Sequence, residues 1–317
     1  MLVPDAASSL APMSPTQPSS GAGRFAPTPS SDLHVGNLRT ALLAWLFARS
    51  SGRAFLVRVE DLDAERCDEQ IAERQLADMA AIGLEWDAPV EVQSHHSQRC
   101  ADAIEQLELA GLTYPCFCTR AERVAQAPHG SQGGYSGRCR DLTEAERRRF
   151  TAEGRTPSLR ARLGDATVEW NDLVLGASSG IADDPIVRRA DGVFAYNLAV
   201  VVDDAASGID QVVRGDDLAH AVPVQAALCD ALAITRPEWA HVPLVVDTNG
   251  DRLSKRNAGT TLAELLSAGL TTQQVLAMIG ASLGLCAADD AVQPQTLLDR
   301  FNPSALPTTP WVFAVPS

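Results

Sequence analysis

The sequence predicts an α/β fold built on a doubly wound parallel sheet, and three observations support this prediction. Short apolar runs alternate with segments of helical periodicity through most of the chain. Polar and acidic clusters follow several of the apolar runs, where parallel strands would open into a ligand crevice. A chain of 317 residues, 45% of them hydrophobic, is long enough for two domains or for one large domain that carries an insertion.

The first element is the stretch 24–37, which has an apolar, strand-like start, a double-proline turn and a step into an amphipathic helix. A strand followed by a tight turn and a helix N-terminus can bind an anion, because free backbone N–H groups and the helix dipole face the ligand. His34 can donate to a phosphate without a fixed charge, and Gly36 lets a flat ligand approach the backbone. On these residues alone, a helix cap with an unrelated histidine explains the pattern equally well. The helical spacing rests on Leu38, Leu42, Trp45, Leu46 and Arg49.

The remaining elements continue the alternation of strands and helices. Residues 53–60 form an apolar run that ends in the carboxylate cluster 60–63, and helices are predicted at 68–83 and 97–112. After an insertion, the sheet pattern resumes with an apolar run that ends at Asp203 and Asp204. In chain order, the later elements are strands at 193–202 and 209–213, a helix at 219–233, a strand at 243–246, helices near 261–268 and 271–284, and a proline-rich end.

The insertion, residues 115–165, carries a candidate metal site. Cys116, Cys118 and Cys139 lie within a glycine- and serine-rich context, and three thiolates require a fourth ligand for a closed tetrahedral site. General chemistry favours His129 as that ligand, and three reduced structural cysteines remain the alternative. Residues 115–163 hold ten arginines against five acidic residues, a local charge of +5. Arg147, Arg148 and Arg149 are typical of a solvated helix face, whereas contact with RNA phosphates is the functional alternative.

Composition limits the function classes. The net charge of −14 excludes a broad nucleic-acid-binding surface, so any basic patch must be local. No apolar run approaches the length of a membrane span, and residues 1–23 lack the features of a signal peptide, which predicts a disordered extension. Seven cysteines without a paired framework predict a reducing, cytoplasmic environment, and nothing in the chain predicts an obligate dimer, so we expect a monomer.

Lys255 is the single lysine of the chain, beside 25 arginines. A lysine retained against this bias suggests a place where a compact, mobile ammonium is required rather than a planar guanidinium, although chance could also explain it. Lys255 lies in the polar loop 248–257, which follows the predicted strand 243–246.

Two separated motifs give these residues a common meaning. His34-Val35-Gly36-Asn37 resembles the HIGH signature of class I aminoacyl-tRNA synthetases, and Arg252-Leu253-Ser254-Lys255-Arg256 resembles their KMSKS loop. The resemblance runs from Arg24 to about residue 285 and is closest to the glutamate branch, whose start resembles the run 24–29. It implies a Rossmann-type catalytic domain of the HUP class in two halves, 24–114 and 166–248. It also implies a zinc-binding insert at 115–165, a KMSKS-like loop with a short helical part at 249–300, and a tail at 301–317.

The resemblance also implies a reaction and a set of site residues. The reaction is activation of L-glutamate by ATP, with Mg accompanying the nucleotide, and it requires positioning and charge stabilisation rather than a side-chain nucleophile. The catalytic residues would be His34 and Lys255. ATP would contact His34, Gly36, Asn37, Arg252, Ser254 and Lys255. Glutamate would contact Arg24, Phe25, Ala26, Pro27, Thr28, Glu60, Tyr196 and Arg214.

The chemistry of glutamate fits the charged members of that set. Two carboxylates and one ammonium call for two cations and one anion, and Arg24, Arg214 and Glu60 all follow or end predicted strands. Tyr196 would supply an aromatic wall and a hydroxyl. The alternative is that Arg24 or Arg214 pairs with Asp61 or Asp216, as partly buried arginines often do.

The length after the second motif points to one subgroup. Only 61 residues follow Arg256, whereas a separate anticodon domain needs about 100. This length, with Cys-x-Cys followed by Tyr-x-x-x-Cys, resembles the small stand-alone enzymes that transfer glutamate to the queuosine base in the anticodon of tRNA(Asp). That resemblance assigns the fourth zinc ligand to Tyr135. It also implies that the anticodon loop docks between the insert and the mouth of the site. The alternatives are a truncated glutamyl-tRNA synthetase that charges the tRNA 3′ end, a nucleotidylyltransferase and a catalytically idle paralogue.

Overall fold

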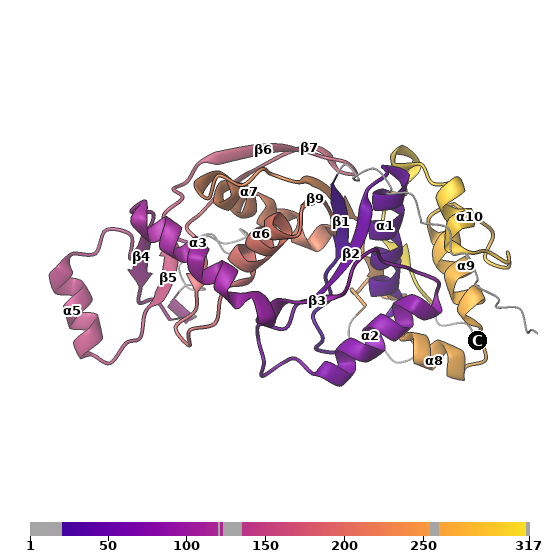
Figure 1. Ribbon diagram of the computed structural model, residues 1–317, viewed down its shortest axis with the longest axis horizontal. Helices are drawn as coiled ribbons and strands as arrows, with labels where there is room; N and C mark the ends of the chain where they lie inside the picture. Colours follow the sequence, from indigo (N-terminus) through magenta and orange to yellow (C-terminus); the bar gives the residue numbers. More distant parts are fainter. Residues whose placement is uncertain (1–20, 120, 123–134, 254–259, 315–317) are drawn as a thin grey trace, which may run out of the picture.

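The computed structural model describes residues 21–119, 121–122, 135–253 and 260–314. In Figure 1 the molecule is elongated, with the main sheet in the middle, the insert at one end and the C-terminal helices at the other. Residues 1–20, His129, Ser254 and Lys255 lie outside the described residues. Within the described part, no helix is both long enough and apolar enough to cross a membrane.

The main sheet has seven strands and is parallel except at one edge. From the central strand β1, the next two strands of the chain extend the sheet to one edge. On its other side β1 pairs with β9, a strand from the second half of the chain, so the order of strands reverses between β1 and β9. β7 closes the far edge by antiparallel pairing with β6. In spatial order the strands are β3 (Glu91–Val92), β2 (Ala54–Val59), β1 (Ala22–Phe25), β9 (Ile209–Gly215), β10 (Glu238–Val242), β6 (Thr167–Asp172) and β7 (Gly176–Ile181). The doubly wound parallel sheet is confirmed, and β1 begins within the predicted extension 1–23, so residues 22 and 23 belong to the sheet.

Helices cover both faces of the sheet. Side chains alternate between faces along a strand, and Val213 packs in the core beside α1 (Val35–Ser50), whereas Val212 packs beside α7 (Val222–Ala231). The helix α6 (Tyr196–Ala206) lies beside α7 and packs on α3 (Ser97–Leu109). Alternate residues along each strand therefore lie on opposite faces of the sheet, one set facing α1 and the other facing α6 and α7.

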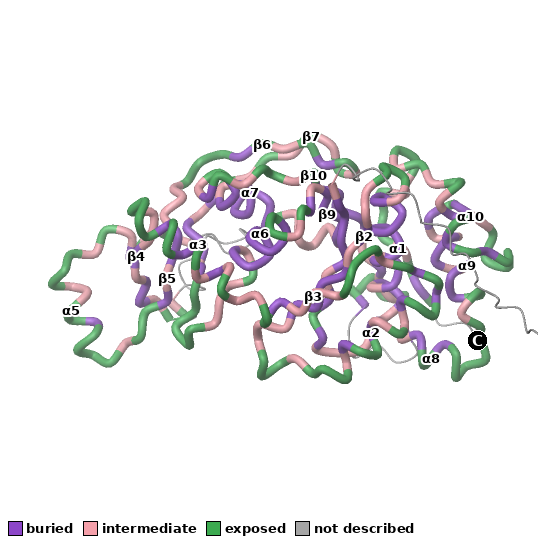
Figure 2. Tube along the Cα trace, viewed as in Figure 1, coloured by how far each residue is buried: buried purple, intermediate pink, exposed green. Residues whose placement is uncertain are grey.

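The helix α1 is buried on nearly every side, contrary to the amphipathic pattern predicted for it. Leu38, Leu42, Trp45 and Leu46 are buried, but so are most of the residues between them, and only Asn37, Thr40, Arg49 and Ser50 are not. The reason is that the sheet covers one side of α1 and the C-terminal helices cover another (Figure 2). These helices are α8 (Leu262–Ser267), α9 (Thr272–Ser282) and α10 (Pro294–Asp299), and α10 lies in the end predicted only as proline-rich.

Two predicted strands are wrong. The apolar run 193–202 is not a strand, because its buried residues belong to α6, and a short apolar run cannot distinguish a buried helix from a buried strand. The strand predicted at 243–246 is absent from the main sheet, where β10 takes that place. Val245–Val246 instead form β11, which pairs with β12 (Trp311–Val312) in a separate small sheet. The helix α2 (Glu69–Ala81) confirms the prediction for 68–83.

The insert is a second, smaller unit that is not one continuous segment. Its antiparallel sheet consists of β4 (Thr113–Cys116), β5 (Ser158–Ala161) and β8 (Ile186–Arg188), and α5 (Glu144–Ala152) projects from it. Between β5 and β8 the chain leaves to form β6 and β7 of the main sheet. The range 115–165 predicted for the insert therefore omits β8.

Candidate active site

The carboxyl end of β1 leads directly to a histidine that caps a helix. His34 is the N-cap of α1, and its Nδ1 accepts hydrogen bonds from the backbone N–H groups of Gly36 at 3.1 Å and Asn37 at 3.2 Å. In return, the Asn37 Oδ1 accepts a hydrogen bond from the His34 backbone N–H at 3.1 Å, which completes a capping box. Because Nδ1 accepts, the proton of the neutral imidazole lies on Nε2.

The free donors predicted at this helix end are mostly occupied. The Val35 N–H donates to the Thr260 carbonyl at 2.8 Å, and the next two N–H groups donate to the His34 ring. The expectation that free backbone N–H groups bind an anion here is therefore wrong for these positions. What remains is the helix dipole and the His34 Nε2–H, which has no partner among the described residues. Burial and the nearby charge of Arg252 lower the pKa of His34 to about 4, so this donor is neutral near pH 7.

Gly36 leaves room for the His34 ring beside the backbone of α1. A Cβ at this position would lie 3.0 Å from the His34 Nδ1 and 3.2 Å from the Cβ of Val245. The imidazole therefore packs directly on the glycine backbone, and this contact fixes the direction of Nε2.

The substitution Gly36→Ala should consequently displace the His34 ring. We expect the rate of adenylate formation to fall about tenfold, because small displacements of a positioning group are costly. The KM for the amino acid should not change, since that predicted site lies on the other face of the sheet. Exchange of ³²P-pyrophosphate into ATP measures both quantities, and an unchanged rate would contradict the role given to Gly36.

The segment that carries the second motif is attached beside His34 at both of its described ends. On one side, the Leu253 N–H donates to the Val245 carbonyl at 3.1 Å, and Arg252 forms an ion pair with Asp217. On the other side, Thr261 forms a β-bridge with His34. The two motifs therefore meet in space, although Ser254 and Lys255 themselves lie outside the described residues.

A buried four-residue charge cluster lies on the α6 face of the sheet. The Asp204 carboxylate accepts from Arg24 Nε at 3.1 Å and from Arg58 Nη2 at 2.7 Å, and Arg58 also pairs with Glu60 at 3.3 Å. Burial raises the pKa of Glu60, whereas Arg24 and Arg58 keep the pKa of Asp204 below its usual range despite burial. Arg24 thus has a carboxylate partner, as the alternative interpretation expected, but the partner is Asp204 rather than Asp61 or Asp216. Its Nη groups have no partner among the described residues.

Arg214 lies at the end of β9, 5% exposed, and its partners are uncharged. Nε donates to His241 Nε2 at 3.0 Å, Nη1 to the Tyr196 hydroxyl at 3.5 Å and Nη2 to the Leu218 carbonyl at 3.2 Å. Among the described residues none forms an ion pair with Arg214. Burial, with the charge of Arg24, lowers the pKa of Arg214. A buried cation without a paired anion is costly, so this position favours an anionic ligand.

The structure thus places most of the predicted glutamate-binding residues on one face of the sheet and the Phe25 side chain on the other. Arg24, Glu60, Tyr196 and Arg214 all belong to the α6 face at the β1/β9 reversal. Phe25 is next to Arg24 on β1 and faces the opposite way, into the core beside α1. Its side chain therefore cannot line the pocket. The turn after β1 runs through Ala26, the buried Pro27 and the exposed Thr28, and the Pro27 carbonyl accepts from the Glu60 backbone N–H at 2.9 Å.

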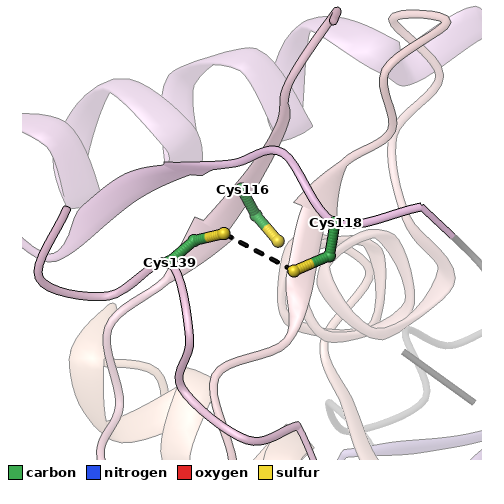
Figure 3. A group of neighbouring side chains, drawn as sticks. All are labelled: Cys116, Cys118 and Cys139. Atoms are coloured by element: carbon green, nitrogen blue, oxygen red, sulfur yellow. Dashed lines mark hydrogen bonds between the residues drawn. The ribbon is translucent and has the colours of Figure 1, made fainter. Parts of the chain in front are cut away.

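The insert holds a cluster of three thiols. The Sγ atoms of Cys116, Cys118 and Cys139 lie within 4.8 Å of one another, and Figure 3 shows the three side chains converging. The Cys118–Cys139 separation of 3.5 Å is far too long for a disulfide and near the ~3.8 Å expected between thiolates on one tetrahedral zinc ion. The Tyr135 hydroxyl lies 3.5 Å from Cys116 Sγ and accepts from the Cys139 backbone N–H at 2.8 Å. This donor set could bind a metal ion.

The basic residues of the insert are largely paired. Arg140 donates to the buried Asp184 at 2.6 Å and also contacts Asp165, so it supports the fold of the insert rather than an RNA surface. On α5, Arg148 and Arg149 also pair, with Glu144 at 3.5 Å and Glu153 at 3.6 Å, but their side chains are 76% and 62% exposed. The solvated helix face predicted for these two residues is confirmed.

Sequence reasoning missed four residues of the site. Arg58 is visible as a charge within the apolar run of β2, and such a residue predicts a buried ionic partner. In the sequence, Asp204 is visible only as the end of an apolar run. Nothing in the local sequence marks Asp172 or His241, whose roles depend on three strands lying side by side.

Comparison with known proteins decides the family. The family model described as "tRNA synthetases class I (E and Q), catalytic domain" matches residues 22–290. A glutamyl-Q tRNA(Asp) synthetase of Nocardia farcinica is 54% identical over 92% of this chain and 93% of its own length. The chain belongs to the glutamyl-Q tRNA(Asp) synthetase family, within the class I synthetases. The predicted resemblance to the class I synthetases is thereby confirmed.

Other relatives of this synthetase family differ in how much of their own length the chain matches. The glutamyl-Q tRNA(Asp) synthetase of Symbiobacterium thermophilum is 42% identical over 91% of this chain and 94% of its own length. A glutamate–tRNA ligase of a Synechococcus strain is 40% identical, but only 53% of its length is matched. Among solved structures, a glutamate tRNA ligase from Elizabethkingia meningosepticum in complex with its amino acid has a TM-score of 0.77 at 25% identity, covering 92% of this chain and 66% of that chain.

Proposed function

We propose that the protein activates L-glutamate with ATP and transfers the glutamyl group to the queuosine base in the anticodon of tRNA(Asp). The single observation that carries the glutamate assignment is Arg214, a buried guanidinium whose partners among the described residues are all uncharged, beside a balanced cluster of charges. The match along 93% of a glutamyl-Q relative, against 53% of a glutamate–tRNA ligase, supports the choice of acceptor.

Glutamate fits the charges of the pocket. Arg24, Arg58, Asp204 and Glu60 carry two positive and two negative charges, and a zwitterionic amino-acid head can join them without a net charge change. The ammonium would take Glu60, and the α-carboxylate would take the free Nη groups of Arg24. The side-chain carboxylate would then bind Arg214, whose guanidinium has five N–H donors and uses three of them.

The first reaction is attack by a carboxylate oxygen of glutamate on the α-phosphorus of ATP, which forms glutamyl-adenylate and releases pyrophosphate. His34 would donate from Nε2 to a phosphate oxygen and so stabilise the charge that develops there. Lys255 would approach the phosphates from the opposite side, and Arg252 would assist it. Mg would enter with the nucleotide.

In the second reaction, a hydroxyl of the cyclopentene ring of queuosine attacks the glutamyl carbonyl, and AMP leaves. The exposed arginines of α5 provide a phosphate-binding surface for the anticodon loop. Reversing the charges of Arg148 and Arg149 should therefore weaken transfer and leave pyrophosphate exchange unchanged.

Zinc is the metal that fits the thiol cluster, with Cys116, Cys118, Cys139 and Tyr135 as ligands. When bound, it would hold the insert together and take no part in the reaction. The alternative fourth ligand, His129, lies outside the described residues.

Metal analysis provides a direct test of this assignment. We expect about one zinc per purified chain, and we expect Cys139→Ser to lose it and to be less stable by several kcal/mol. Cys229→Ser is the matched control, because Cys229 is equally buried but lies in the core between α6 and α7. Equal zinc content in both variants would contradict the site.

The decisive experiment separates activation from transfer. Glutamate should support ATP–pyrophosphate exchange without any tRNA. Labelled glutamate should then appear on queuosine-containing tRNA(Asp) and not on the same tRNA lacking queuosine. Labelling of tRNA(Glu) regardless of queuosine would instead identify a truncated glutamyl-tRNA synthetase, and glutamate-independent exchange would refute the activation step.

A further inference from the structure

Behind Arg214, a chain of three buried side chains crosses three adjacent strands. Arg214 on β9 is the register partner of His241 on β10, and Asp172 ends the neighbouring strand β6. Their exposed fractions are 5%, 0% and 2%. Arg214 Nε donates to His241 Nε2 at 3.0 Å, and the other ring nitrogen, Nδ1, is hydrogen-bonded to Asp172 Oδ2.

These contacts leave one tautomer for the histidine. A guanidinium N–H can only donate, so His241 Nε2 must be the acceptor, and Nδ1 must carry the ring proton and donate it in the hydrogen bond to Asp172. The second oxygen of Asp172, Oδ1, accepts three backbone N–H groups, from His241 at 3.0 Å, Val174 at 3.0 Å and Leu175 at 3.1 Å. The carboxylate is therefore fixed in orientation, and it fixes the ring.

We propose that His241 is a positioning residue that determines specificity, because it holds Arg214 through a neutral acceptor, and that Asp172 keeps it in the accepting tautomer. This inference rests on the proposed function, in which Arg214 binds the side-chain carboxylate of glutamate. Burial lowers the pKa of His241, which agrees with a neutral ring.

The neutral imidazole matters because of what a carboxylate would do in its place. A carboxylate in direct contact would form an ion pair with the guanidinium and balance its charge, as Asp204 does for Arg24 and Arg58. The imidazole instead places the Asp172 charge one ring-width away and occupies a single donor. Arg214 is thus rigid but still lacks a paired anion, and a substrate with a neutral amide, such as glutamine, would leave it so. The site should therefore bind glutamate in preference to glutamine, because only glutamate supplies the anion that Arg214 lacks.

The substitution Asp172→Asn tests the relay sharply. The amide oxygen must replace Oδ1, since three N–H groups face that position, so the amide NH₂ must face His241 Nδ1. The ring then has to accept at Nδ1 and carry its proton on Nε2, where it opposes the N–H of Arg214. We expect the KM for glutamate to rise about tenfold or more, with the KM for ATP changed by less than about twofold.

A pair of variants at His241 separates positioning from packing. His241→Leu should raise the KM for glutamate as Asp172→Asn does and should lower the ratio of kcat/KM for glutamate over glutamine. His241→Gln can present an acceptor to Arg214 Nε and should restore most of both quantities. The melting temperature is recorded for each variant, and if Asp172→Asn does not fold, the comparison of leucine with glutamine decides.

The inference is overturned if His241→Gln fails as badly as His241→Leu, or if the variants raise the KM values for ATP and glutamate equally. It is also overturned if the glutamate-to-glutamine ratio is unchanged in His241→Leu. The wild-type protein distinguishes the two levels of the argument, because absence of glutamate-dependent exchange there refutes the proposed function itself.

Discussion

Replacing His34 by asparagine should slow glutamyl-adenylate formation by about 10²- to 10³-fold, the usual cost of losing one donor to a developing charge. Asparagine is among the best N-cap residues, so the amides of Gly36 and Asn37 keep an acceptor and α1 keeps its start. Only the Nε2–H is removed. Pyrophosphate exchange at saturating glutamate and ATP measures the rate, and thermal unfolding measures the stability.

The alanine variant provides the complementary control. His34→Ala removes both the donor and the cap, so it should show the same loss of rate together with a loss of about 1 kcal/mol in the free energy of unfolding. If the asparagine variant exchanges at the wild-type rate, His34 is a helix cap and nothing more, and the ATP-binding role is wrong.

The second large effect is expected at Arg214. Arg214→Leu should reduce kcat/KM for glutamate by about 10²- to 10³-fold, because the substrate carboxylate would enter a buried site without its cation. The free protein should not lose stability, since a buried guanidinium without an ionic partner is costly and leucine is not. Initial rates of exchange over a range of glutamate concentrations measure the first effect, and thermal unfolding measures the second.

Two control variants make that experiment specific. Arg214→Lys keeps the charge but loses the planar fork and should recover only part of the activity. Arg236→Leu removes an arginine whose ion pair with Asp230 is half exposed, and it should leave exchange unchanged. If Arg214→Leu behaved like Arg236→Leu, the side-chain carboxylate of the substrate would have to bind elsewhere.

Local patterns in the sequence predicted the parts of the site that depend on neighbours along the chain. His34 and Gly36 lie two residues apart, and their contact follows from the first turn of one helix. Cys116 and Cys118 are separated by one residue, so only Cys139 had to return to them. The strand 54–59 and the helix 69–81 were also predictable, because their apolar residues repeat at the spacing of a single element.

The rest depends on which strands become neighbours, and the sequence pattern does not contain that information. Asp172, His241 and Arg214 are brought together only because β6, β10 and β9 are adjacent. The helix α6 was predicted as a strand because it is buried between α3 and α7, and burial on several sides removes the polar face that marks an amphipathic helix. The same reason explains why α1 is more uniformly buried than its spacing suggested.

The burial of α1 between the sheet and the C-terminal helices has a consequence for biosynthesis. The hydrophobic core around Leu38, Leu46 and Phe47 is completed by Leu276 and Leu297, which the ribosome adds more than 200 residues later. Contacts so distant in sequence form late and slow folding. The nascent chain must therefore leave the second apolar side of this helix uncovered through most of translation, and a chaperone that binds such surfaces would bind within the first 50 residues.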